Sequence, residues 1–241
     1  MTLTHYGFRE WGSALLILLL ILAGCWYLGY ELHWMKTATG IAAGATVVFL
    51  AVAAFFRNPC RTIPKNPSLI ISPADGVVRD IAEVEDFNLP PFNGPAVRIG
   101  IFLSVLNVHV NRAPAELTVE NVSYRKGEFL DARHEGASQR NEAMTISGTA
   151  VSGEQTFPVA VRQISGAIAR RIVCPVKAGK HLRKGEIYGM IKFGSRTELY
   201  LPVKSNFEPA VSVGDRVFGG MTVIARFCAK QETASVPVQK K

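Results

Sequence analysis

The sequence contains a serine, a histidine and an aspartate whose surroundings could support nucleophilic chemistry. Ser195 follows Gly194, and a glycine can adopt a turn with positive φ that leaves its carbonyl open to attack by the next side chain. The Ser195 hydroxyl is a weak nucleophile until a neighbouring base takes its proton. His109 is the candidate base, and Asp75 is the candidate partner that orients it. The hypothesis is that the protein cuts its own Gly194–Ser195 bond.

Each candidate also has an ordinary structural explanation. A Gly-Ser pair is a common turn before a strand, and an aspartate before glycine, as in Asp75-Gly76, is common in turns. A single histidine in an apolar stretch, such as His109, more often fills a core position than acts as a catalyst. The chemical interpretation therefore depends on whether the fold brings the three residues together.

The residues around the three candidates predict β-strands. Residues 195–202 alternate between polar and apolar side chains, which is typical of a strand that begins at Ser195. Residues 96–111 are almost wholly apolar and rich in β-branched side chains, as expected of a buried strand, and His109 lies near their end. Residues 70–78 contain two β-prone stretches around the turn that holds Asp75.

Two glycine-rich stretches of similar form, residues 179–187 and 214–223, flank the Gly194-Ser195 stretch. Turns of this form recur in lipoyl-type carrier domains, although no lysine stands at a hairpin tip as a lipoyl attachment would require. We therefore predict a mainly β protein whose catalytic domain, residues 57–228, is of the β-sandwich type with lipoyl-like turns. Residues 229–241 form a polar tail that we expect to be disordered.

Two apolar segments precede the predicted β domain. Residues 11–30 and 37–56 contain no charged side chain, and a helix of roughly 20 apolar residues is long enough to span a bilayer. We predict that residues 1–56 form a membrane anchor of two apolar helices joined by a tight connector at residues 31–36. The second segment is rich in Ala, Gly and Thr, so a buried or half-inserted helix is the alternative.

Charge around these segments predicts their orientation. Arg57, Arg61 and Lys65 follow the second segment, so the positive-inside tendency places the large C-terminal part on the cytoplasmic face of the cell membrane. A lipoprotein cleavage box ending at Cys25 would reverse this placement. The apolar run continues beyond that cysteine and a second apolar segment follows, which argues against a short signal peptide.

Overall charge and cysteine usage narrow the possible partners. The formal net charge is +8, but no basic helix or interleaved aromatic and basic patch points to nucleic acid. With membrane segments present, an anionic lipid surface is the better partner for this charge. The four cysteines are scattered, with no CxxC pair and no histidine cluster, so we predict neither a metal site nor a disulfide framework.

Three sequence motifs contain Asp75, His109 and Ser195 in turn, and all three follow the predicted membrane segments. They are Ser-Pro-Ala-Asp-Gly at 72–76, Asn-Val-His-Val-Asn-Arg-Ala-Pro at 107–114 and Phe-Gly-Ser-Arg-Thr-Glu-Leu-Tyr-Leu-Pro at 193–202. With these motifs the chain closely resembles the phosphatidylserine decarboxylases, in particular the short bacterial and archaeal-type members. The resemblance extends from about residue 57 to about residue 227.

The resemblance implies a self-processing carboxy-lyase that converts phosphatidylserine to phosphatidylethanolamine and CO2 in phospholipid biosynthesis. Ser195 would become a pyruvoyl group that forms a Schiff base with the substrate amine, so no diffusible cofactor would be needed. His109 would be the base and Asp75 its partner. Cleavage between Gly194 and Ser195 would leave a heterodimer of a large chain, residues 1–194, and a small chain, residues 195–241.

The resemblance leaves several details open. His109 is the first candidate for the group that protonates the substrate α-carbon. The basic linker after residue 56, Arg112 or Arg196 could bind the phosphodiester, and the sequence does not choose among them. The lipid could be ester-linked or an ether-linked analogue, because the headgroup chemistry is the same.

Two other functions compete with the decarboxylase. A membrane-anchored serine hydrolase could use the same three residues without self-cleavage, but Ser195 lacks the Gly-x-Ser-x-Gly spacing of a nucleophile elbow. A membrane-tethered β-sandwich adaptor would make Ser195 a turn residue and His109 a core residue. Replacing Ser195 with alanine would then change neither chain integrity nor any activity.

Overall fold

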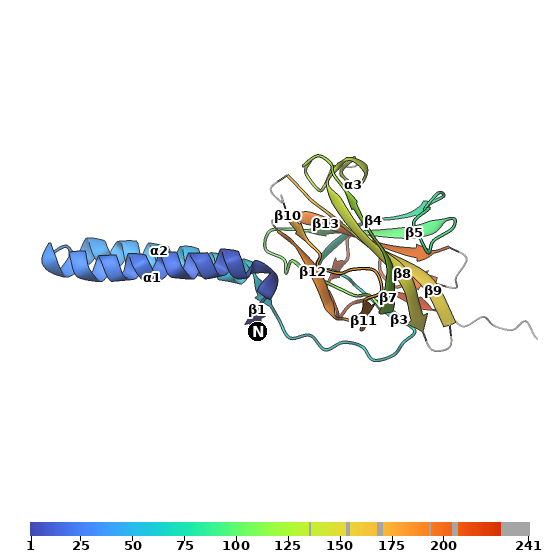
Figure 1. Ribbon diagram of the computed structural model, residues 1–241, viewed down its shortest axis with the longest axis horizontal. Helices are drawn as coiled ribbons and strands as arrows, with labels where there is room; N and C mark the ends of the chain where they lie inside the picture. The colour runs from blue at the N-terminus through green and yellow to red at the C-terminus, as the bar shows by residue number, and fades with distance from the viewer. Residues whose placement is uncertain (135, 153–154, 168–170, 193, 204–206, 228–241) are drawn as a thin grey trace, which may run out of the picture.

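The computed structural model describes residues 1–134, 136–152, 155–167, 171–192, 194–203 and 207–227 of the chain. Figure 1 shows two long helices that extend from one side of a β-rich domain. The mainly β character predicted from the sequence is confirmed, and the two apolar helices precede the strands of the domain core. The predicted polar tail, residues 229–241, and Phe193 of the third motif lie outside the described residues.

The two helices form a hairpin. α1 (Phe8–Glu31) and α2 (Met35–Phe55) pack side by side and are joined by a tight turn in which His33 has φ +58° (Figure 1). At 1.5 Å per residue they are about 36 Å and 32 Å long, which exceeds the roughly 30 Å hydrocarbon layer of a bilayer. Both are long and apolar enough to cross a membrane, and 6% of the most apolar part of α2 is buried within the protein. α2 is therefore not a helix buried in the domain.

Both ends of the hairpin return to the same edge of the β domain. β1 (Thr2–Leu3) pairs with β2 (Arg57–Asn58), so the residues before α1 and after α2 are hydrogen-bonded to each other. The short 3₁₀ helix η1 (His5–Gly7) connects β1 to α1. The apolar contact that joins the hairpin to the domain consists of Tyr6, Trp11, Val52, Phe55, Phe56 and Met190.

The β domain is built around an eight-stranded antiparallel sheet with the strand order β11-β7-β8-β9-β13-β5-β4-β15. In chain order its strands are β4 (Gly76–Val84), β5 (Ala96–Leu103), β7 (Glu116–Arg125), β8 (Ala143–Ser152), β9 (Gln155–Ile164), β11 (His181–Leu182), β13 (Ser195–Pro202) and β15 (Arg216–Val217). β13 lies in the interior of the sheet, paired with β5 on one side and β9 on the other. The strand predicted to begin at Ser195 is therefore confirmed.

Two three-stranded sheets complete the domain, with the strand orders β10-β12-β6 and β14-β16-β3. Their strands are β3 (Leu69–Ile71), β6 (Val110–Arg112), β10 (Arg171–Val173), β12 (Ile187–Lys192), β14 (Phe207–Pro209) and β16 (Val223–Phe227). The short helix α3 (Ala137–Arg140) lies between β7 and β8 in the chain and at the top of the domain in Figure 1.

The two glycine-rich stretches place matching strands at the two edges of the large sheet. The glycines that bound their turns, Gly179, Gly185, Gly214 and Gly220, all have positive φ. The first turn holds β11, which pairs with β7, and the second holds β15, which pairs with β4. The similar sequences therefore form similar edge elements on opposite sides of one sheet.

The alternation of side chains along β13 separates two faces of the large sheet. The inner face carries Ser195, Thr197, Leu199 and Leu201, and the outer face carries Arg196, Glu198 and Tyr200. The inner leucines belong to the main apolar core together with residues of β5 and β9. Adjacent residues at the start of β13 consequently face two different environments.

Candidate active site

Gly194 and Ser195 form the entry to β13. Gly194 has φ +62°, in the left-handed region that glycine adopts without strain, so the positive φ expected at this position is confirmed. Ser195 pairs with Leu103 of β5 and is completely buried. Its Oγ has no hydrogen-bond partner among the described residues. The hydroxyl can therefore turn towards a neighbouring group without breaking a bond.

His109 lies just before β6, and its imidazole faces the Gly194 peptide. The Gly194 N–H donates to Nε2 across 3.3 Å, and Nδ1 lies 2.9 Å from the Asn107 carbonyl oxygen. These partners assign the proton to Nδ1 and a lone pair to Nε2. His109 is fully buried, and this burial lowers the pKa of its imidazole to about 4. The ring is therefore a neutral base at neutral pH.

The helical hairpin forms one wall of the space around His109. The ring of Phe55, the last residue of α2, packs on the imidazole with a centroid distance of 4.3 Å and an interplanar angle of 34°. Arg57 donates a hydrogen bond to the carbonyl of Leu106, which belongs to the loop before His109. The end of the hairpin thus contacts both the ring and the loop that carries it.

The segment before Gly194 is also tied to the hairpin. Lys192 is buried, and its Nζ forms an ion pair with the carboxylate of Glu10 in α1. The same Nζ lies 5.8 Å from the ring centre of Phe56. The hairpin therefore contacts the candidate base and also the segment that leads to the Gly194–Ser195 bond.

Gly166 leaves room for the carbonyl that would be attacked. A Cβ built on Gly166 would lie 2.4 Å from the carbonyl oxygen of Gly194, which is closer than real Cβ atoms approach a backbone oxygen. Any other residue type would displace either this loop or the carbonyl. The close approach of two backbone segments requires glycine at this position.

Asp75 lies in a separate cluster. Its Oδ2 pairs with Nη2 of Arg61 at 2.8 Å, and its Oδ1 accepts the Gly219 N–H at 2.7 Å. Burial raises the pKa of the carboxyl group, while Arg61 and the Gly219 amide oppose that shift. In the described part of the chain, no hydrogen bond or ion pair joins Asp75 to His109. The structure places His109 against Gly194, the residue before Ser195, and the Asn107 carbonyl occupies the position expected for Asp75.

The two arginines considered for the phosphodiester are both held by protein groups. Arg112 donates to the Gly185 carbonyl at 3.0 Å and to the Asn58 side chain at 2.8 Å, which ties the linker to the domain. Arg196, on the outer face of β13, pairs with Asp80 at 2.7 Å and with Glu198 at 2.8 Å. Both guanidinium groups are therefore engaged in contacts within the protein.

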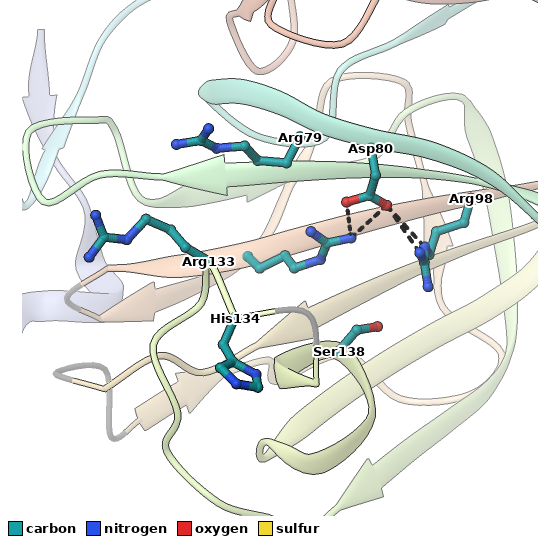
Figure 2. A pocket seen from close by; sticks show the side chains of 7 residues that line it. Arg79, Asp80, Arg98, Arg133, His134 and Ser138 are labelled. Atoms are coloured by element: carbon teal, nitrogen blue, oxygen red, sulfur yellow. Dashed lines mark hydrogen bonds and ion pairs between the residues drawn. The ribbon is translucent and has the colours of Figure 1, made fainter.

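Two cavities meet near the start of β13. A cavity of about 330 Å³ is lined by Phe102, Leu103, Ser104, Val105, Asp131, Ala132, Arg133, Ala167 and Gly194. A second cavity of about 550 Å³ on the outer face is lined by Arg79, Asp80, Arg98, Arg133, His134, Ser138 and Arg196, and Figure 2 shows this cavity. Arg133 lines both cavities, so the cavity beside Gly194 borders a strongly basic one.

The described residues contain no group of three or more His, Cys, Asp or Glu side chains that could hold a metal ion. The site instead offers groups of the chain itself. A buried serine hydroxyl with no partner among the described residues follows a glycine in a left-handed conformation, and the N–H of that glycine contacts a neutral imidazole. These residues fit the conversion of Ser195 into a pyruvoyl group.

Comparison with known proteins identifies the family. The sequence profile described as phosphatidylserine decarboxylase matches residues 48–225. A phosphatidylserine decarboxylase proenzyme of Carboxydothermus hydrogenoformans is 55% identical over 181 residues, which cover 75% of this chain and 81% of the relative. The chain belongs to the phosphatidylserine decarboxylase family.

Other members of the phosphatidylserine decarboxylase family match at lower identity. A proenzyme of the same name from Rhodopirellula baltica is 43% identical over 189 residues, covering 78% of this chain and 76% of the relative. One from Neisseria gonorrhoeae is 38% identical over 215 residues, covering 89% of this chain and 74% of the relative. The name proenzyme indicates that these relatives are made as precursors.

The decarboxylase site includes two residues that the sequence analysis did not select. Asn107 acts through its carbonyl, while its side chain accepts hydrogen bonds from the N–H and Oγ of Ser104, each at 2.8 Å. Gly166 has no Cβ, which leaves space for the carbonyl oxygen of Gly194. The available signal was an asparagine that closes the Ser104 turn, whereas Gly166, two residues after the end of β9, offered none.

Proposed function

We infer that this chain is a self-processing phosphatidylserine decarboxylase, which converts phosphatidylserine to phosphatidylethanolamine and CO2. The observation that carries the inference is the contact between Nε2 of His109 and the N–H of Gly194, the residue directly before Ser195. The membership of a family whose relatives are named decarboxylase proenzymes supports it. We propose Ser195 as the nucleophile and His109 as the base.

Cleavage begins with proton transfer to His109. Nε2 takes the proton of the Ser195 hydroxyl, and Oγ attacks the carbonyl carbon of Gly194. The new C–O bond forms an ester, the C–N bond of the peptide breaks, and the imidazole returns the proton to the freed Ser195 nitrogen. Because the pKa of His109 is about 4, the imidazole is neutral at neutral pH and its Nε2 lone pair is available to accept the proton.

The ester is then removed by β-elimination. His109 takes the α-proton of Ser195, the Cβ–Oγ bond breaks, and Gly194 leaves as the carboxylate end of the large chain. The dehydroalanine that remains tautomerises to an imine, water adds to its carbon, and ammonia departs. The small chain, residues 195–241, then begins with a pyruvoyl group and stays with the large chain, residues 1–194, as a heterodimer.

The pyruvoyl group supplies a ketone for the substrate amine and an electron sink for the pair released with CO2. The cavity beside Gly194 suits loss of the carboxylate because much of its wall is apolar, formed by Phe102, Leu103, Val105, Ala132 and Ala167. We propose that His109 donates the proton to the substrate α-carbon. The new Gly194 carboxylate would raise the pKa of the imidazole, because a nearby negative charge favours its protonated form.

We propose that the hairpin holds this chemistry at a lipid surface. We propose that residues 1–56 anchor the protein and that the catalytic domain, residues 57–228, lies on the cytoplasmic face, because Arg57 and the basic linker follow α2 directly. Phe55 of α2 touches His109, so the end of the membrane segment and the site are in contact. Leu106, in the loop before His109, is 83% exposed and suits an apolar surface.

Asp75 is assigned a positioning role. Its pair with Arg61 holds the linker that continues back to Arg57 and Phe55, and these residues contact the His109 ring and its loop. Asp75 would then act on the base through the linker, by keeping the end of α2 seated on the site. The Asn107 carbonyl orients the imidazole directly.

The activity is tested on the full chain purified in detergent and mixed with phosphatidylserine in neutral micelles. We expect release of CO2 and formation of phosphatidylethanolamine, measured by mass spectrometry, and no product from the Ser195→Ala variant. A fluorophosphonate probe separates the rival hydrolase, which would keep one intact chain labelled at Ser195. A mature, two-chain protein that leaves phosphatidylserine unchanged would contradict the substrate assignment.

A further inference from the structure

The outer cavity carries an excess of positive charge. Four arginines and one aspartate line it, Arg79, Arg98, Arg133, Arg196 and Asp80, so the charged lining groups sum to three positive charges. Figure 2 shows the guanidinium groups of Arg79 and Arg133 on the same side of the cavity, both directed away from the Asp80 carboxylate. A concave site of this charge is suited to an anion.

The four arginines differ in how far protein carboxylates neutralise them. Arg196 is buried between Asp80 and Glu198, and Arg98 shares Asp80 at 3.2 Å. Arg133 pairs with Asp131 at 2.6 Å, and its side chain is 64% exposed. Among the described residues, no carboxylate pairs with Arg79, whose guanidinium carbon lies 5.4 Å from the ring centre of Phe102.

Arg133 connects this charge to the reaction centre. It lines the basic cavity and also the cavity that contains Gly194 and Phe102. Arg79 packs over Phe102, which lines the smaller cavity, so both arginines lie at the boundary of the two cavities. A ligand that reaches Ser195 through the smaller cavity would bring its next polar group to this boundary.

The chemistry of a phosphatidylserine headgroup decides which anion the arginines bind. Its carboxylate must lose its negative charge as CO2 leaves, and an arginine pair would stabilise the charged ground state and slow that loss. Its phosphodiester keeps its charge throughout the reaction, so a guanidinium clamp there binds ground and transition states alike. The arginines therefore suit the phosphodiester, and the apolar walls near Gly194 suit the carboxylate.

We propose that Arg79 and Arg133 form a clamp for the substrate phosphodiester, which holds the headgroup while its amine reaches the Ser195-derived ketone. This proposal rests on the proposed decarboxylase function. The clamp uses neither of the two arginines considered from the sequence. Arg112 donates to Asn58 in the linker, and Arg196 pairs with Asp80 and Glu198.

Binding is measured without turnover on the uncut Ser195→Ala precursor in neutral detergent. Glycerophosphoserine and glycerophosphoethanolamine, which carry the phosphodiester without acyl chains, are titrated by calorimetry, with inorganic phosphate as a third probe. We expect Arg79→Gln and Arg133→Gln each to weaken both phosphodiesters by about tenfold, as loss of a charge-assisted hydrogen bond implies. If only glycerophosphoserine weakens, the arginines bind the carboxylate and the proposal fails. If inorganic phosphate binds tighter than both, the cavity serves a free anion and the proposal fails.

The mature enzyme provides a second readout when the short headgroups bind too weakly for calorimetry. Arg79→Gln and Arg133→Gln should mature into two chains and raise KM for phosphatidylserine about tenfold, with a smaller change in kcat, because uniform binding is lost. Arg183→Gln is the matched control, since the Arg183 side chain is 85% exposed and lines neither cavity. Arg79→Gln is decisive because it breaks no ion pair among the described residues, so an unchanged KM would overturn the clamp. A wild-type protein that neither matures nor decarboxylates would instead refute the proposed function.

Discussion

Adjacent residues of β13 face two sites of opposite character. Ser195 lies on the inner face, fully buried beside a neutral imidazole, and its Oγ has no partner among the described residues. Arg196 lies on the outer face, where two carboxylates hold it in the lining of a basic cavity. The contrast separates two tasks, because bond cleavage needs a protected neutral base while recognition of an anionic headgroup needs accessible positive charge.

Self-cleavage should be lost or strongly slowed when the reacting groups of the inner site are removed. We expect Ser195→Ala to leave the chain uncut and His109→Gln to slow cleavage at least about 100-fold, because a general base typically contributes that much or more. Denaturing gel electrophoresis after timed incubation measures the fraction cut. Normal maturation of the His109→Gln variant would show that another group is the base.

The space around the attacked carbonyl should be nearly as sensitive. Gly166→Ala places a Cβ against the Gly194 oxygen, so we expect cleavage to slow by about 100-fold, as a displacement of about 1 Å in a reacting group does. Gly44→Ala is the matched control, because a Cβ there meets nothing within 4 Å. Equal cleavage rates in the two variants would remove Gly166 from the site.

Acid should stop cleavage by protonating His109. The pKa of the imidazole is about 4 in the folded precursor, so the rate should be flat from pH 8 to about 5 and fall about tenfold per unit below pH 4. A fall centred near pH 6.5, the ordinary histidine value, would contradict the buried, neutral base. The rate is followed by quenching samples at timed intervals.

The lowered pKa of His109 should also make the unfolding free energy depend on pH. The unfolded chain takes up the His109 proton near pH 6.5 and the folded chain only near pH 4, so this contribution is complete above pH 6.5 and lost as pH falls towards 4. The loss amounts to about 3 kcal/mol of unfolding free energy. Comparing denaturant unfolding of the Ser195→Ala precursor with and without His109→Gln isolates this contribution.

The smallest effect is expected for the linker contact. Asp75→Asn and Arg61→Gln should each slow cleavage by about three- to tenfold, since each loses a hydrogen-bonded ion pair that acts on His109 only through the linker. The double variant should be no slower than the single ones, because both remove the same contact. If Asp75→Asn abolished cleavage while Arg61→Gln did not, Asp75 would be a direct partner of the base.

Local patterns made the fold and the turn at Gly194 predictable. Two charge-free runs of about 20 residues predict the hairpin, and the alternation of polar and apolar side chains predicts β13. The glycine before Ser195 predicts the left-handed turn. The contacts that escaped prediction join distant segments through groups without a sequence signal. Asp75 could be recognised as special, but its pair with Arg61 follows from the path of the linker, and the Gly166 contact follows from the approach of two backbones.

The arginine cavity escaped prediction for a related reason. Arg79 and Arg133 come from β4 and from the loop after β7, and only the folded sheet brings them to one cavity. Arg196 belongs to the third sequence motif, yet its guanidinium group is paired with Asp80 and Glu198. Position in a motif therefore predicts the reacting serine but did not indicate which arginine has free donors.

The most direct test of the self-cleavage account is a denaturing mass spectrum of the full-length protein purified in detergent. We expect two chains that meet at Gly194 and Ser195, with the small chain blocked at its start and lighter by one ammonia than a peptide beginning with serine. A single intact chain in a folded, active preparation would contradict self-cleavage and the pyruvoyl group together.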